Sequence, residues 1–99
     1  MSLQGETREK TRIKIRQPKH YRVIMHNDDF TSMEFVVEIL MDIFHKESTE
    51  AERLMLLVHQ SGKAAVGEYP YDIAVTKVQK AAARAKQEGF PFRMTVEEI

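Results

Sequence analysis

Three consecutive polar residues, Asn27, Asp28 and Asp29, interrupt an apolar part of the sequence. Their amide and carboxylate oxygens can accept hydrogen bonds from a cationic group or coordinate a metal ion. The same residue types also form turns, because their short side chains bond to the neighbouring backbone. The stretch is therefore a predicted turn with four candidate uses: catalysis, metal binding, nucleic-acid contact and ligand binding.

Catalysis would use the two aspartates as acids and His26 or His59 as a base. Side chains of sequence neighbours on a turn point in different directions, so Asp28 and Asp29 do not form a ready acid–base pair. The chain has no cysteine, and it shows no nucleophile elbow, phosphate loop or zinc-binding helix motif. We therefore expect that this protein is not an enzyme and uses no cofactor.

Metal binding and nucleic-acid contact find equally little support. A calcium loop needs acidic positions that alternate through a longer segment containing glycine, which the Asn-Asp-Asp run does not provide. Residues 1–20 carry six lysines and arginines against two glutamates, and this basic tail is the only feature that favours nucleic acid. The rest of the chain is acidic and the chain contains no tryptophan, so a stacking surface for bases is not indicated. We expect no metal site and no nucleic-acid partner.

Ligand binding fits the residues best. The oxygens of Asn27 and Asp28, with a neutral His59 nitrogen, would accept hydrogen bonds from a positively charged head group. Methionine and valine side chains follow nearby, and methionine adapts to bulky apolar groups of several shapes. A free α-amino group, whose pKa of about 7.7–8.0 keeps it mostly charged at neutral pH, is such a head.

Alternation and helical periodicity predict the elements that must position these residues. Strands are expected at residues 21–27, 63–69 and 92–98, and helices at about 31–45, 49–61 and 70–88. The sequences from Thr31 to Glu34 and from Thr49 to Glu52 have the capping-box spacing, so Thr31 and Thr49 are the predicted helix caps. Gly62 and Gly89 are predicted to end the second and third helices.

This order predicts a two-layer α+β domain, β-α-α-β-α-β, whose three-stranded sheet carries three helices on one face. The third helix should pack through small residues, with Val78, Ala81, Ala82 and Ala85 in its stripe. A chain of 99 residues with 42% hydrophobic residues suits one core. We expect residues 1–19 to be a flexible tail and residues 20–99 to fold as a cytoplasmic, monomeric domain that does not enter a membrane.

Three blocks of the sequence resemble the ClpS family, the N-end-rule adaptors of the bacterial AAA+ protease Clp. The blocks are YRVIMHNDDFTSMEFVVEIL, LMLLVHQSGKAAVG and DIAVTKV, which stand in the family's order and cover most of residues 20–80. The resemblance implies the fold predicted above. It also implies that the protein binds substrates whose N-terminal residue is Leu, Phe, Tyr or Trp, and delivers them to a Clp unfoldase for degradation by ClpP.

The resemblance also implies roles for individual residues. Asn27, Asp28 and His59 would hold the α-amino group of the substrate, while Asp29 and Thr31 would shape the mouth of the pocket and support the turn. The hydrophobic pocket would be lined by Met33, Val36, Met55, Val58 and Phe92. On a different surface, the N-terminal domain of the unfoldase would be contacted by Asp72 and Lys77.

Some positions depart from the family's pattern. Ser32 replaces a common proline, Phe92 stands where leucine is usual, and Val75 stands where glutamate is frequent before Thr-Lys. The last departure slightly weakens the expected unfoldase contact, and the departures together leave open whether the unfoldase is of the ClpA or the ClpC type. The order of elements also resembles the C-terminal domain of a ribosomal stalk protein, but that domain lacks the Asn-Asp-Asp turn and the His59 motif.

Overall fold

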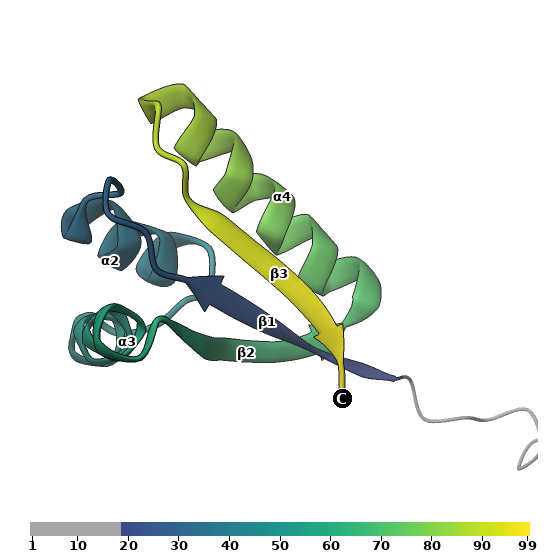
Figure 1. The fold of residues 1–99 in the computed structure, drawn as a ribbon. Coiled ribbons are helices and arrows are strands. Elements are labelled where there is room, and N and C mark those ends of the chain that lie inside the picture. The colour runs from purple at the N-terminus through teal and green to yellow at the C-terminus, as the bar shows by residue number, and fades with distance from the viewer. Residues whose placement is uncertain (1–18) are drawn as a thin grey trace, which may run out of the picture.

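The fold has three strands and three helices in the predicted order (Figure 1). The computed structural model describes residues 19–99, so the predicted tail lies almost entirely outside the described residues and remains a prediction. Along the chain the elements are β1 (His20–His26), α2 (Met33–Asp42), α3 (Ser48–Ser61), β2 (Lys63–Pro70), α4 (Tyr71–Glu88) and β3 (Arg93–Glu98). The predicted α+β class and element order are confirmed.

β1 is the central strand, with β2 and β3 antiparallel on either side of it. Its alternating residues divide between two faces: Val23 and Met25 are fully buried in the core that the helices cover. Arg22 and Ile24 occupy the opposite face. There the Arg22 guanidinium forms ion pairs with glutamates of both neighbouring strands. The sheet therefore has one apolar face for the helices and an opposite, mixed face on which Arg22 forms ion pairs and Ile24 is buried.

The three helices share a single core with the apolar face of the sheet. α4 runs alongside β3 and packs against all three strands, while α2 and α3 form a helical hairpin beyond the end of β1 (Figure 1). Ala74, Ala81 and Ala85 are the buried residues of α4, and their small size lets the helix lie close to the sheet. Ala82, which we predicted in this stripe, is exposed, and Ala74 belongs there in its place. None of the helices in residues 19–99 is long and apolar enough to cross a bilayer.

The beginning of α2 differs from the prediction by one residue. Ser32, not Thr31, caps the helix: its hydroxyl accepts a hydrogen bond from the backbone N–H of Phe35 at 3.1 Å. Thr31 therefore lies outside the helix, and its hydroxyl donates to Asp28 instead. Because two hydroxyl residues stand side by side here, sequence spacing alone identified the wrong one.

Two predicted helix boundaries, the end of α2 and the start of α3, differ from those in the structure. α2 ends at Asp42 rather than near residue 45, since His45 has a left-handed backbone with φ 56°. The Lys77 ammonium donates to the Ile43 carbonyl at 2.6 Å, which satisfies one of the free carbonyls at the end of the helix. α3 begins at Ser48 without any side-chain cap, so the predicted capping box at Thr49 is wrong.

The corrected caps predict different stabilities for two similar variants. Ser32→Ala removes the side-chain cap bond to the first turn of α2 and should lower the free energy of unfolding by about 1 kcal/mol. Thr49→Ala is the matched control, because α3 has no capping bond to lose, and its effect should stay within about 0.5 kcal/mol. Urea denaturation measures both. Equal losses in the two variants would contradict the assignment of Ser32.

Candidate functional site

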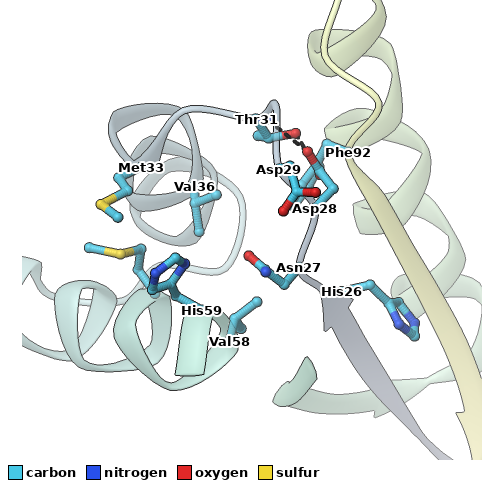
Figure 2. A pocket seen from close by; sticks show the side chains of 11 residues that line it. His26, Asn27, Asp28, Asp29, Thr31, Met33, Val36, Val58, His59 and Phe92 are labelled. Carbon is cyan, nitrogen blue, oxygen red and sulfur yellow. Dashed lines mark hydrogen bonds between the residues drawn. The ribbon is translucent and has the colours of Figure 1, made fainter. Parts of the chain in front are cut away.

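A pocket of about 200 Å³ opens at the carboxyl end of β1, between that strand, α2 and α3 (Figure 2). The structure brings together all ten residues that the sequence placed in the pocket, from segments up to 65 positions apart. The lining residues are Asn27, Asp28, Asp29, Thr31, Met33, Val36, Met55, Val58, His59 and Phe92, together with His26. Only His26 was not assigned to it beforehand.

One backbone hydrogen bond brings the turn and α3 together. The N–H of Asn27 donates to the carbonyl of Gly62 at 2.8 Å, directly after β1 ends. Gly62 ends α3 in the left-handed conformation, with φ 87°, as its position in the sequence predicted. The last turn of α3, with Val58 and His59, is thereby held opposite Asn27. In Figure 2 the Asn27 side chain extends into the space that these residues border.

The Asp28 carboxylate organises the turn. One oxygen, Oδ1, accepts hydrogen bonds from the backbone N–H groups of Phe30 and Thr31, at 2.8 and 2.7 Å. The other, Oδ2, accepts the Thr31 hydroxyl at 2.7 Å. A carboxylate has about four lone-pair sites, so the turn uses three and leaves one at Oδ2 for a further donor. Asp28 is therefore both a turn-forming residue and a free acceptor at the pocket.

Two opposing effects act on the pKa of Asp28. Partial burial raises the pKa, but the hydrogen bonds from Thr31 and Phe30 outweigh it, so the pKa lies below the ordinary value. The ionised carboxylate thus stabilises the folded turn at every pH above the unfolded pKa of about 3.9. This contribution is lost as the pH falls through the lower, folded pKa.

The two histidines of the pocket differ in what they can do. The His26 ring lies 2.8 Å from the Thr95 hydroxyl and points toward β3, away from Asn27 (Figure 2). Burial, followed by the charges of Arg93 and Lys63, lowers the pKa of His26. The His59 ring is exposed and faces the pocket. His59 is therefore the histidine that is available to a ligand.

The apolar wall has a rigid base and an adaptable rim. Val58 and Phe92 are buried at the base, and the Phe92 ring packs edge-on against Phe35, with 5.5 Å between centroids. Met33 and Met55 form the rim, and Met33 is 47% exposed. An exposed methionine at the rim can change rotamer without disturbing the core. Met33 is therefore not core filler.

The pocket offers hydrogen-bond acceptors on one side and apolar groups on the other. Within residues 19–99, no three His, Asp or Glu side chains are grouped closely enough to hold a metal ion. The arrangement instead suits an organic cation with one bulky apolar arm. Binding such a ligand requires no bond to be made or broken.

Asp72 and Lys77 lie on α4, outside the pocket. Asp72 is exposed in the first turn of the helix, and the exposed side chains of Tyr71 and Ile73 flank it. The Lys77 ammonium is bonded to Ile43 and lies over the Phe44 ring, so it also holds α2. The sequence did not predict that Tyr71 and Ile73 are exposed, because exposed apolar residues have no periodic signal.

Comparison with known proteins identifies the class. Residues 16–95 match the model of the family described as "ATP-dependent Clp protease adaptor protein ClpS", and the chain belongs to this family. It is 48% identical over 85 residues to the ClpS adapter of Nitratidesulfovibrio vulgaris, covering 86% of this chain and 85% of that protein. It is 51% identical over 83 residues to the Treponema denticola ClpS adapter, covering 84% and 82%.

A solved structure has the same fold. Agrobacterium tumefaciens ClpS2, bound to L-phenylalaninamide, superposes with a TM-score of 0.81 and is 37% identical. The match covers 84% of this chain and all of that chain. The predicted family and fold are thus confirmed, and the protein is a member of a family of adaptors of the Clp protease, not of proteases.

The hydrogen bonds of the turn predict how the Asp28 pKa responds to mutation. Thr31→Val keeps the shape of the side chain but removes the hydroxyl donor, so the Asp28 pKa should rise. A pH titration of the Asp28 carboxyl carbon by NMR measures this. Thr95→Val, which removes the hydroxyl beside His26, is the control and should leave the Asp28 pKa unchanged. An unchanged Asp28 pKa in Thr31→Val would contradict the hydrogen-bond assignment.

Proposed function

We propose that the pocket binds the first residue of proteins that begin with Leu, Phe, Tyr or Trp. The observation that carries this proposal is the placement of three acceptor side chains, Asn27, Asp28 and His59, opposite an apolar wall in one small pocket. An N-terminal residue presents the matching pair of groups: a charged amine and, one carbon away, an apolar side chain. The pocket volume of about 200 Å³ suits one side chain rather than a drug-sized ligand.

The number of acceptors matches the number of donors. A protonated amine has three N–H donors and no acceptor. Asp28 retains one lone-pair site, Asn27 supplies an amide oxygen, and a neutral His59 ring supplies a nitrogen. The amine therefore replaces its bonds to water with three bonds to the protein, one of them to an anion. The apolar arm then extends toward Met33 and Val36 on one side and Val58 on the other.

The ligand of the Agrobacterium protein supports this proposal. L-phenylalaninamide has a free amine, a benzyl group and a carboxamide, which makes it a chemical equivalent of the first residue of a polypeptide. A related chain with the same fold binds it, so a bulky aromatic first residue is a suitable ligand for this pocket.

We propose further that the protein delivers such substrates to a Clp AAA+ unfoldase of the ClpA or ClpC type, which works with ClpP. On this proposal it acts as a monomer in the cytoplasm. The exposed group Tyr71, Asp72 and Ile73 at the start of α4 supports a second contact surface away from the pocket. Lys77 would contribute less than expected, because its ammonium already bonds within the chain.

Blocking the amine should abolish most of the binding. A peptide that begins with Leu or Phe should bind with micromolar or tighter affinity, as measured by fluorescence anisotropy. Its N-acetylated form should bind at least about tenfold more weakly, because a hydrogen bond to a charged group contributes roughly 1.5–3 kcal/mol. The same peptide beginning with Ile is the second control and should also bind weakly. Equal binding of free and acetylated peptides would exclude the proposed site.

The exposed rim of the pocket predicts a change in specificity. Met33 lines the pocket, and the resemblance to the ClpS family implies that it excludes β-branched first residues. Met33→Ala should therefore let peptides that begin with Ile or Val gain affinity. Met41→Ala is the matched control, because Met41 is an exposed methionine of the same helix that does not line the pocket. Anisotropy with Leu, Ile and Val peptides measures the change. If both variants keep the wild-type specificity, Met33 does not select the substrate.

A further inference from the structure

The mixed face of the sheet, which the helices leave uncovered, carries a row of basic side chains. Alternation along β1 puts His26 on this face, together with Arg22 and Ile24. The register places Lys63 of β2 and Arg93 of β3 directly opposite His26, one on each side. Lys63 and Arg93 are both exposed. We call these three residues, which cross all three strands, the basic row.

The other end of the same face is built with the opposite charge pattern. Arg22 also lies on the central strand, but the residues directly opposite it are Glu68 and Glu97. Both glutamates form ion pairs with the Arg22 guanidinium, at 3.8 and 3.3 Å. Within residues 19–99, the lysine and the arginine of the basic row form no ion pair. The protein's own carboxylates therefore neutralise one end of the face and leave the other end positive.

The basic row is unfavourable for the fold by itself. Like charges on directly opposite residues of neighbouring strands are destabilising. The repulsion also acts on the histidine: after burial, the charges of Arg93 and Lys63 lower the pKa of His26. A bound anion would remove the repulsion between the cations and favour the protonated ring. The row therefore has more to gain from an anion than a pair of isolated surface cations would have.

The centre of the row has a fixed orientation. The His26 Nε2 atom lies 2.8 Å from the Thr95 hydroxyl of the same face, and the ring is turned toward β3 (Figure 2). Neighbouring strands are about 4.8 Å apart, so the backbones of Lys63 and Arg93 are separated by about 10 Å. Their long side chains can meet over the ring. Ammonium and guanidinium groups only donate hydrogen bonds, so the row suits a ligand whose oxygens only accept them.

We propose that the basic row binds a phosphate group, either as inorganic phosphate or as part of a phosphorylated molecule such as ATP. The two permanent cations match the charge of a phosphate group, which is about −1.5 to −2 at pH 7. A tetrahedral group also has oxygens on opposite sides, so it can accept from Lys63 and Arg93 at once, whereas the oxygens of one carboxylate lie in a plane. The site does not depend on the proposed function of the pocket, because Lys63 and Arg93 do not line the pocket.

A titration of the full chain with phosphate, followed in amide NMR spectra at constant ionic strength, tests the site. The signals of the basic row should shift and saturate at millimolar phosphate, whereas chloride should give no saturation. Malonate, a dianion with two carboxylates, should bind more weakly. Tighter binding of ATP than of phosphate would identify a nucleotide as the source of the phosphate group. No saturation with either ligand, or equal affinity for malonate, would overturn the proposal.

Three variants with the same change in net charge locate the site. Lys63→Gln and Arg93→Gln should each weaken phosphate binding about 2- to 5-fold, the range expected for one exposed ion pair. Arg22→Gln is the matched control, because it removes a cation from the same face about 13 Å along β1, beyond the Debye length of about 10 Å at 0.1 M salt. It should leave phosphate binding unchanged. Equal weakening in all three variants would show that only the overall charge matters and would exclude the site.

The same variants should differ in stability when phosphate is absent. Lys63→Gln and Arg93→Gln relieve repulsion, so the midpoint of urea denaturation at low salt should rise. Arg22→Gln breaks two ion pairs, so its midpoint should fall. The measurement also shows that each variant is folded, which separates a loss of phosphate binding from unfolding. A lower midpoint in all three variants would contradict an uncompensated basic row.

The pKa of His26 reports the bound anion directly. The charged and titratable groups around its ring are Lys63 from β2, Arg93 from β3, and Asp28, Asp29 and His59 on the side of the pocket. Sulfate is a tetrahedral dianion whose charge stays constant between about pH 5 and pH 8, so a bound sulfate should raise the pKa of His26. The exposed His45, in the loop after α2, is the control. NMR titration of the ring protons measures both histidines, and an equal shift in the two would indicate general salt screening and exclude the site.

Discussion

The hydrogen bond from the Asn27 N–H to the Gly62 carbonyl is the contact on which the rest of the site depends. It extends the pairing of β1 and β2 by one step, to the point where β1 turns away and α3 has just ended. A strand end and a helix end are thereby held together, each carrying its own polar side chains. Together with the β1–β2 ladder that precedes it, this contact holds Asn27 near His59, although the two are 32 positions apart.

Asp28 extends that constraint from the backbone to the proposed ligand. Its carboxylate closes the turn by accepting three hydrogen bonds, and it can do so only because Ser32 caps α2 and leaves the Thr31 hydroxyl available. Such a carboxylate cannot rotate to follow a ligand, so its remaining lone pair has a set direction. The polar half of the pocket is therefore preorganised, while the methionine rim adapts.

Local patterns predicted most of the fold. Alternation identified β1, and the conformational freedom of glycine identified the ends of α3 and α4 at Gly62 and Gly89. Local patterns failed where two hydroxyl residues compete for one cap, as at Thr31 and Ser32. They also failed where a long-range contact replaces a local one: nothing in the sequence indicates that the Lys77 ammonium reaches the carbonyl of Ile43.

The members of the pocket came from a resemblance to known sequences, since no local rule joins Phe92 to Asn27. Both ends of the described chain lie at the opposite end of the sheet, where the Ile99 N–H donates to the His20 carbonyl (Figure 1). β1 has seven residues, so the termini are about 23 Å from the turn that begins the pocket. A dye, an affinity tag or a surface linker joined to Ile99 is thus held a full strand length away from the ligand.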